Sequence, residues 1–248
     1  MNIIITGATS GFGKAIAEKF ATPEHQLWLI GRRKNRLEEL QQKLSSKAAQ
    51  VHFTVLDVRE KNEVETFQKE LQNTWSQVDL LVNNAGLALG TQTIDKGSSE
   101  DWDTMIDTNI KGLLYMTKAV TPMMIQQKSG HIINMGSTAG KTVYQNGNVY
   151  CATKFAVDAL SQTMRIDLLP HQIKVTSINP GMAETEFSLV RYHGDAEKAK
   201  EVYNGFQALS AEDVADTVFY CANLPKHVCI NDLTITCLQQ ANSVYKVK

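Results

Sequence analysis

Tyr150 and Lys154 stand four residues apart in the segment VYCATKFAVDAL, which spans residues 149–160. The apolar residues around them predict a helix, and side chains four apart on a helix project from the same face. A free phenol has a pKa of about 10 and is a poor base at neutral pH, but a neighbouring ammonium stabilises the phenolate. The pair therefore suits general acid–base chemistry, in which Tyr150 takes a proton from an alcohol or gives one to a carbonyl.

Ser137 is the third residue that suits this chemistry. It closes the run HIINMGS, which predicts a strand before the tyrosine helix, so its hydroxyl can hold a substrate oxygen beside Tyr150. The alternative is a half-buried helix tyrosine with a lysine stem extended along it, because a bare Tyr-x-x-x-Lys spacing occurs often by chance. The serine and the glycine loop described below favour the catalytic interpretation.

The elements that must position these residues alternate regularly between strands and helices. Short apolar runs predict strands over residues 2–6, 27–31, 51–57, 78–86, 131–137, 173–181 and 231–236. Helical patterns cover residues 12–20, 37–44, 64–75 and 211–224, with two helices or one bent helix over 101–127. Ser210 and Asp213 suit the start of the last helix. This alternation predicts a doubly wound α/β fold, with a parallel sheet and helices on both faces.

The chain has 248 residues, enough for one large α/β domain and too few for two of ordinary size. We therefore expect a single domain over residues 1–248. Residues 184–210 show no regular period, which is typical of a lid over the substrate. Within this lid Arg191 carries a guanidinium that pairs well with a carboxylate, so we expect it to bind the acid group of a substrate. A surface arginine on a mobile lid is the alternative.

The loop TGATSGFG, residues 6–13, lies between the first predicted strand and the first predicted helix. Its glycines allow a tight turn and a close backbone approach, and the helix N-terminus behind them attracts an anion such as a pyrophosphate. The spacing differs from the G-x-G-x-x-G fingerprint by a wider first gap, and a glycine-rich turn without a ligand is the alternative. The loop residues expected to contact a dinucleotide are Gly7, Thr9, Ser10, Gly11, Phe12 and Gly13.

The end of the next predicted strand indicates which dinucleotide binds. An enzyme that uses NAD normally has an acidic residue there, about 20 residues past the glycines, for the ribose hydroxyls. The segment IGRRKNR instead provides Arg32 and Arg33, which suit the 2′-phosphate of NADP. We therefore predict NADP as the cofactor, with two solvated surface arginines as the alternative.

The motifs TGATSGFG, NNAG and YCATK occur in this order, and with them the chain resembles the short-chain dehydrogenase/reductase family from the first strand to about residue 180. The segments NNAGLALG, WDTMIDTNIKGLLYMTKAV, GHIINMGSTAG and PGMAETEFSLVRYHGDAEKA resemble its NADP-dependent 3-hydroxy acid dehydrogenases, which act on serine, allo-threonine and related compounds. The resemblance implies a Rossmann-like sheet of seven parallel strands and a tetramer assembled through long helices.

The same resemblance implies site residues. The family's catalytic tetrad of asparagine, serine, tyrosine and lysine falls here on Asn109, Ser137, Tyr150 and Lys154. The backbone carbonyl of Asn109 would hold a water that links Lys154 to solvent, and Lys154 would also bond the nicotinamide ribose. Further cofactor contacts implied by the resemblance are Asp57, Val58, Asn83, Ala85, Gly86, Tyr150, Pro180, Gly181 and Thr185.

Composition and charge narrow the possible partners. The 25 basic residues are balanced by 26 acidic ones, which offers no electrostatic footprint for nucleic acid or an anionic membrane. The four cysteines lack C-x-x-C pairing, and His131 and His193 share no ligand spacing, so no metal site is expected. The N-terminus has no basic region and its apolar run is too short for a signal peptide, so we expect a cytoplasmic protein.

These observations predict an NADP-dependent oxidoreductase that transfers a hydride between the nicotinamide and the 3-carbon of a short 3-hydroxy acid, such as serine, allo-threonine or 3-hydroxyisobutyrate. One alternative is a reductase for another carbonyl, such as a 3-oxoacyl thioester or a sugar ketone. A second is a protein that binds NADP and regulates another process without turnover, although an intact tetrad argues against it. Lys141 and Tyr144 are further candidates for the wall of the substrate pocket.

Overall fold

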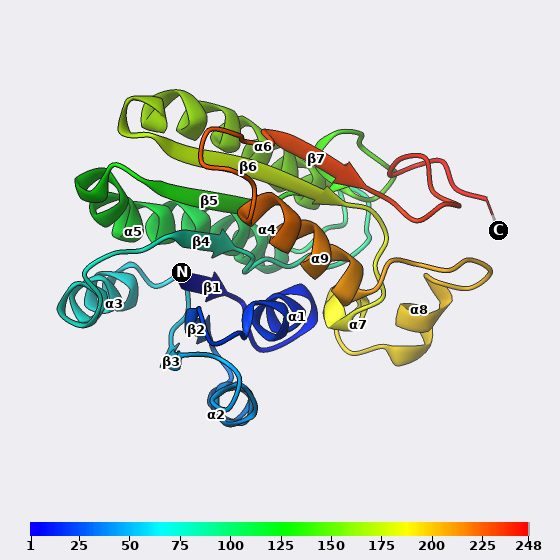
Figure 1. Cartoon of the computed structure of the whole chain (residues 1–248). Coiled ribbons are helices and arrows are strands. Elements are labelled where there is room, and N and C mark those ends of the chain that lie inside the picture. Colours follow the sequence, from blue (N-terminus) through cyan, green and yellow to red (C-terminus); the bar gives the residue numbers. More distant parts are fainter. Residues whose placement is uncertain (248) are drawn as a thin grey trace.

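The computed structural model describes residues 1–247, and its centre is a seven-stranded sheet in the order β3-β2-β1-β4-β5-β6-β7 (Figure 1). All neighbouring strands pair in parallel. The strands are β1 (Asn2–Thr6), β2 (Gln26–Gly31), β3 (Gln50–Val55), β4 (Leu80–Asn83), β5 (Gly130–Met135), β6 (Ile173–Pro180) and β7 (Asp232–Ile235). The strand order reverses between β1 and β4, and ligands of such sheets bind at the carboxyl ends beside this point.

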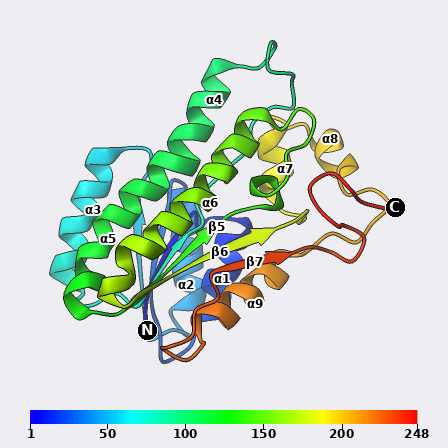
Figure 2. The same ribbon diagram turned by 90° about the horizontal axis from the view of Figure 1, so that it is seen from above.

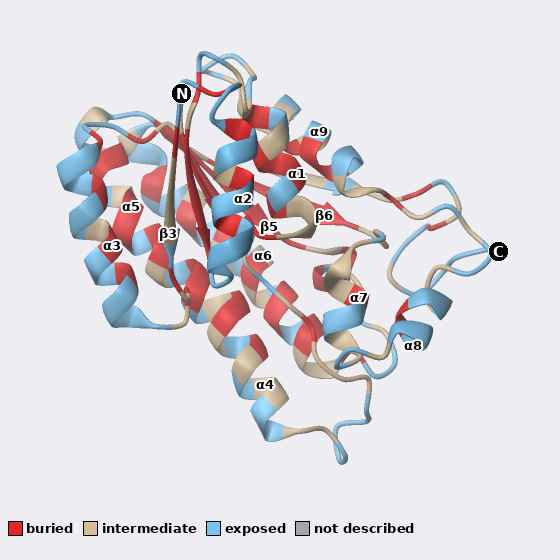
Figure 3. Ribbon diagram, turned by 90° about the horizontal axis from the view of Figure 1, so that it is seen from below, coloured by how far each residue is buried: buried red, intermediate tan, exposed pale blue. Residues whose placement is uncertain are grey.

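Helices cover both faces of the sheet, and the side chains of each strand alternate between two apolar cores. In β1, Ile3 and Ile5 pack with α1 (Gly11–Phe20), α2 (Lys34–Leu44) and α9 (Ala211–Ala222). Ile4 points the other way and packs with α3 (Lys61–Thr74), α5 (Leu113–Gln127) and α6 (Asn148–Leu168). Figure 3 shows the central strands buried, the edge strand β3 partly of intermediate burial and the outer helix faces exposed. The predicted doubly wound α/β fold with seven parallel strands is confirmed.

The segment predicted as two helices or one bent helix is a continuous helical stretch with a π-helical turn inside it. This stretch consists of α4 (Ser99–Ile106), the π-helical turn η1 (Asp107–Gly112) and α5. A π-helical turn interrupts the regular hydrogen bonding of an α-helix and is frequent at functional sites. Asn109 lies within this turn.

The aperiodic segment 184–210 contains two helices that its sequence pattern does not reveal. They are α7 (Glu186–Arg191) and α8 (Ala196–Glu201), each of six residues and therefore too short to show a helical period. Figures 1 and 2 place α7, α8 and residues 236–247, the C-terminal segment, beyond the carboxyl end of the sheet. After them, Ser210 and Asp213 form the expected reciprocal cap at the start of α9.

Candidate active site

The glycine loop between β1 and α1 forms a cradle that larger residues would fill. Gly7 and Gly11 have positive φ angles of 67° and 48°. A Cβ atom on Gly13 would lie only 2.3 Å from the Gly7 carbonyl oxygen. Backbone and helix N-terminus therefore meet here without side chains between them, which is the geometry that admits a pyrophosphate.

A cavity of about 270 Å³ runs along the carboxyl ends of the central strands from this loop. It brings together most of the residues predicted to contact a dinucleotide. Those lining it are Gly7, Thr9, Ser10, Gly11, Phe12, Arg32, Arg33, Asp57, Val58, Ala85, Gly86, Tyr150, Lys154 and Thr185. We call it the cofactor cavity. Its glycine cradle, its arginines at one end and its tyrosine at the other fit a nicotinamide dinucleotide.

Four predicted cofactor residues lie outside this lining. Gly13 lies behind the loop, and Pro180 and Gly181 line a neighbouring cavity. The side-chain amide of Asn83 donates to the hydroxyl of Thr117 and to Asn134 Oδ1, at 3.0 and 2.9 Å, so Asn83 joins β4 to α5 and β5.

Asn84, which belongs to the NNAG segment expected beside the cofactor, lies in the cofactor cavity. Its Nδ2 donates to the carbonyl of Thr6 at 2.8 Å and to that of Gly7 at 3.3 Å. These bonds tie the end of β4 to the glycine loop. The position of Asn84 inside the NNAG motif was the available signal.

The two predicted arginines stand at the far end of the cofactor cavity. Arg32 Nη1 lies 3.6 Å from Asp57 Oδ2. Burial alone would raise the pKa of Asp57, but hydrogen bonds from Arg59 outweigh it and hold that pKa below its usual value. Arg33 donates from Nε and Nη2 to the Thr9 hydroxyl, at 3.1 and 3.0 Å, and so fixes the guanidinium against the glycine loop.

Tyr150 and Lys154 share one face of α6, as expected, and both are buried. Lys154 Nζ donates to the Met135 carbonyl at 2.8 Å and lies 6.0 Å from the centre of the Tyr150 ring. Burial lowers the pKa of Lys154 to about 8. Burial raises the pKa of Tyr150 above its ordinary value, while a hydrogen bond with Ser137 and the charge of Arg191 act in the opposite direction.

Ser137 lies at the end of β5, where the chain turns into the short 3-10 helix η2 (Thr138–Gly140). Its Oγ accepts a hydrogen bond of 3.0 Å from the Ala139 amide, which caps that helix and fixes the hydroxyl near Tyr150. The hydroxyl of Ser137 and the phenol of Tyr150 are therefore placed to hold the same substrate oxygen.

Asn109 uses its side chain for the loop that follows β4. Its Oδ1 accepts from the Leu87 amide at 2.9 Å, and its Nδ2 donates to the Leu87 carbonyl at 2.8 Å and to the Thr153 hydroxyl at 3.0 Å. Asn109 is buried outside the cofactor cavity, while a Cβ on Gly86 would lie 3.2 Å from its Oδ1 and 3.6 Å from Lys154 Nζ. The side chain of Asn109 thus fixes the position of Gly86 and Leu87 next to Lys154.

A second cavity, of about 280 Å³, adjoins the first, and we call it the substrate cavity. The two cavities share Phe12, Gly136, Tyr150, Thr185 and Phe187 in their walls. Tyr150 therefore stands at their border. A hydride donor or acceptor in the first cavity and an alcohol in the second would meet beside this phenol.

The substrate cavity contains Ser137 and Arg191, two of the predicted substrate contacts. The Arg191 guanidinium carbon lies 5.4 Å from the centre of the Tyr144 ring and 5.9 Å from that of Tyr150. Its Nε donates to the Gly90 carbonyl at 3.4 Å. Helix α7 thus brings one positive charge close to Tyr150.

Thr185, the last residue of the PGMAET segment, lies beside the glycine loop. A Cβ on Gly11 would lie 3.4 Å from the Thr185 Cβ. The Thr185 hydroxyl accepts from the Phe187 amide at 3.2 Å and caps α7. Thr185 therefore lies at the border of both cavities, because it lines each of them.

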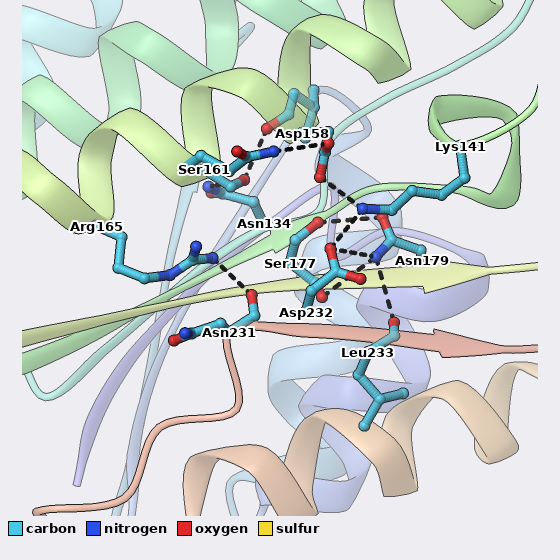
Figure 4. A network of polar contacts seen from close by, with 12 residues as sticks. Asn134, Lys141, Asp158, Ser161, Arg165, Ser177, Asn179, Asn231, Asp232 and Leu233 are labelled. Carbon is cyan, nitrogen blue, oxygen red and sulfur yellow. Dashed lines mark hydrogen bonds and ion pairs between the residues drawn. The ribbon is translucent and has the colours of Figure 1, made fainter.

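Lys141 and Tyr144, the two further candidates for the wall of the substrate pocket, lie in different places. Tyr144 lines the substrate cavity. Lys141 is outside it and forms ion pairs with Asp158 and Asp232, at 2.7 and 2.6 Å (Figure 4). Asn179 Nδ2 donates to the same Asp232 carboxylate at 3.1 Å, so Lys141 ties α6 to β6 and β7. Lys141 is therefore a structural residue, which corrects that part of the prediction.

The C-terminal segment supplies part of the substrate cavity that the sequence pattern did not predict. Its contributions are Gln240, Ser243 and Lys246. Gln240 is buried, and its Oε1 accepts from the Met182 amide at 2.7 Å, which fixes the backbone just after β6. No helical or strand period marks residues 236–247, so the sequence held no signal for this wall.

Within residues 1–247, no group of three or more His, Cys, Asp or Glu side chains is arranged to hold a metal ion. Over the same residues, none of the helices combines the length and apolar character needed to cross a membrane.

Comparison with known proteins identifies the family. The family model described as short chain dehydrogenase matches residues 1–194. The chain belongs to the short-chain dehydrogenase family, whose resemblance the sequence motifs had indicated.

Individual relatives match along almost the whole chain. The NADP-dependent 3-hydroxy acid dehydrogenase YdfG of Escherichia coli K12 is 46% identical over 242 residues, which cover 97% of this chain and 96% of that protein. Sulfoacetaldehyde reductase 2 of Chromohalobacter salexigens is 46% identical over 246 residues, 99% of this chain and 97% of that protein. The closed form of a serine dehydrogenase complexed with NADP+ superimposes with a TM-score of 0.94 at 45% identity, covering 100% of this chain and 99% of that one.

Proposed function

We propose that this protein is an NADP-dependent oxidoreductase that transfers a hydride between the nicotinamide and the 3-carbon of a short 3-hydroxy acid. The observation that carries this proposal is the place of Tyr150 in the wall of both cavities. One cavity has a glycine cradle and two arginines, and the other has a serine hydroxyl and an arginine on a lid. A proton and a hydride can therefore leave the same alcohol in opposite directions.

The catalytic residues divide the work. When bound, NADP accepts the hydride in oxidation and its reduced form supplies the hydride in reduction. Ser137 holds the substrate oxygen, and Tyr150 takes the proton from an alcohol or gives one to a carbonyl. Lys154, whose Nζ lies 6.0 Å from the centre of the Tyr150 ring, is proposed to stabilise the phenolate that forms when Tyr150 loses its proton. Asn109 positions the loop under the cofactor through its bonds to Leu87.

NADP is proposed over NAD because arginines occupy the end of β2. Arg33 is held against Thr9 by two hydrogen bonds, and Arg32 stands beside Asp57. Both guanidinium groups are therefore near the adenosine end of the cofactor cavity, where they can bind a 2′-phosphate. The YdfG dehydrogenase is named as NADP-dependent, and the serine dehydrogenase structure is a complex with NADP+.

An acid substrate is proposed because the charge of Arg191 faces the substrate cavity. The relatives support this class: one is named for 3-hydroxy acids, one for serine and one for sulfoacetaldehyde. Each of these substrate names denotes a small molecule with an acid group next to the reacting carbon chain. A carboxylate or sulfonate that pairs with Arg191 would leave the hydroxyl carbon near Ser137 and Tyr150.

We extend the proposal to the organisation of the protein. The chain is proposed to be a single Rossmann-like domain, with residues 184–210 as a lid that closes on the substrate. Support comes from the core clusters, which run from β1 to the C-terminal half of the chain, and from the contact of α7 with both cavities. A homotetramer in the cytoplasm is the proposed working form.

The test is the absorbance of reduced nicotinamide in mixtures of purified protein with NADP or NAD. The panel contains serine, allo-threonine, 3-hydroxyisobutyrate, isethionate and neutral alcohols of matched length. Reduction of NADP by the hydroxy acids, with little reaction of the neutral alcohols, is the expected result. Activity with neutral alcohols alone would remove the acid from the proposal. No activity with bound NADP would favour a regulator or a thioester reductase.

A further inference from the structure

A carboxylate from the lid lies on the arginines of the cofactor cavity. Glu186, the first residue of α7, places Oε2 at 2.9 Å from Arg33 Nη1 and Oε1 at 2.6 Å from Arg36 Nη1. Each carboxylate oxygen thus pairs with a different guanidinium. Arg36 was not among the predicted cofactor residues, and it lies on α2 one turn beyond Arg33.

The same two arginines are also bound to the glycine loop. Arg33 donates to the Thr9 hydroxyl, and Arg36 Nη1 donates to the Thr9 carbonyl at 3.4 Å. Thr9, Arg33 and Glu186 all line the cofactor cavity. Loop, helix α2 and lid therefore meet at one cluster of charges at the end of the cavity proposed for the adenosine.

The cluster is open to solvent and has the charge pattern of an anion site. The side chains of Arg33, Arg36 and Glu186 are 42%, 43% and 39% exposed, so the ion pairs are weak and a ligand can reach them. Burial would raise the pKa of Glu186, but hydrogen bonds from both arginines hold it below its usual value, so the carboxylate is charged at neutral pH. A phosphate offers the same arginines more charge and more acceptor oxygens.

We propose that Glu186 is an internal competitor of the 2′-phosphate: its carboxylate occupies Arg33 and Arg36, and the phosphate of the cofactor must displace it. This rests on the proposed function, in which NADP is the cofactor. Two consequences follow. Arg36 is a third cation of the 2′-phosphate site, and the exchange of anions couples the adenosine end of the cofactor to the lid that carries Thr185 and Arg191.

Calorimetry on the full chain tests the competition without any turnover. The two probes are adenosine 2′,5′-bisphosphate, which carries the 2′-phosphate, and 5′-AMP, which lacks it. Glu186→Gln keeps the shape of the side chain and removes its charge, so we expect about three- to tenfold tighter binding of the bisphosphate and no change for AMP. The gain should shrink at high salt, because the competing charges are partly exposed.

Matched controls come from α2, the helix that carries Arg36. Glu38 on α2 pairs with Lys34 at 3.7 Å, outside the lining of the cofactor cavity. Glu38→Gln should therefore leave both affinities unchanged, as should Lys34→Met. Arg36→Met should weaken the bisphosphate about tenfold and leave AMP unchanged. Glu186→Asp, whose shorter carboxylate cannot reach both arginines, should give part of the gain of Glu186→Gln.

Two results would overturn the inference, and they are distinguishable. If the wild-type protein prefers the bisphosphate but Glu186→Gln binds it equally or less tightly, Glu186 is no competitor and the proposed cofactor stands. If the wild-type protein binds both probes with equal affinity, the choice of NADP fails first and the inference falls with it.

Discussion

The two cavities that meet at Tyr150 are built from different kinds of structure. The cofactor cavity is walled mainly by strand ends and by the loop into α1, which the buried sheet holds in place. The substrate cavity is walled by the turn after β5, by α7, by residues 202–203 and by the C-terminal segment, most of which lie beyond the sheet. We infer that the buried sheet fixes the place of the cofactor, while the choice of substrate depends on short surface elements that can change without disturbing the core.

The largest expected effect is the loss of kcat when Tyr150, which lines both cavities, lacks its hydroxyl. Tyr150→Phe removes the proton donor and acceptor but keeps the ring, so we expect kcat to fall about 1,000-fold with little change in cofactor affinity. Initial rates and calorimetry with NADPH measure the two quantities. A parallel fall in cofactor affinity and kcat would show that Tyr150 contributes mainly to cofactor binding, and it would contradict the proposed role of Tyr150 between the two cavities.

The next largest effect is expected in the preference for NADP over NAD. Changing Arg32 and Arg33 together to Asp and Ile removes the cations proposed for the 2′-phosphate, and kcat/KM with NADP should fall about 100-fold. The value with NAD should change much less. Equal losses with the two cofactors would show that the arginines stabilise the loop rather than select the phosphate.

A smaller effect is expected on the substrate side. Arg191→Met should raise KM for hydroxy acids about tenfold or more and leave KM for neutral alcohols nearly unchanged. Arg191→Lys keeps the charge but loses the planar guanidinium, so its KM for hydroxy acids should lie between those of the wild-type protein and Arg191→Met. Steady-state kinetics at saturating NADP measures this, and equal changes for acids and alcohols would contradict a role in binding the acid group.

The pH dependence should give the smallest effect, a change of a few-fold between pH 7 and 9. Burial raises the pKa of Tyr150 and lowers that of Lys154 to about 8. Oxidation needs Tyr150 to accept a proton, so its kcat/KM should rise between pH 7 and 8, and the rise should end above pH 8, where Lys154 loses the charge that stabilises the phenolate. Reduction needs the protonated phenol and should not rise with pH. Rate profiles in both directions test this, and an oxidation rate that falls between pH 7 and 8 would contradict the role of Tyr150.

The cofactor side could be predicted from the sequence because each of its motifs follows a strand. Glycines, arginines and the NNAG segment come directly after apolar runs, and parallel strands bring such positions to one edge. The exception was Asn83, which is still within β4 and faces the helices, so that its neighbour Asn84 reaches the glycine loop.

The substrate side was only partly predictable. Arg191 was identified by its chemistry within an aperiodic segment, and it does line the cavity. Gln240 and Lys246 reach the same cavity from the far end of the chain, where no period or motif marks them. Their placement depends on tertiary contacts such as the bond from the Met182 amide to Gln240, which a local pattern cannot reveal. Lys141 was misassigned for the same reason, since Asp232, one of its partners, is distant in sequence.

The transfer of deuterium from a labelled substrate tests the central claim most directly. Serine carrying deuterium on its 3-carbon is incubated with the protein and NADP, and the reduced cofactor is analysed by mass spectrometry, with serine labelled on the 2-carbon as the matched control. Hydride transfer from the 3-carbon predicts deuterium in NADPH from the first substrate and none from the second. Unlabelled NADPH from the 3-labelled serine, or label from the 2-carbon, would contradict hydride transfer at the carbon whose oxygen Ser137 and Tyr150 are proposed to hold.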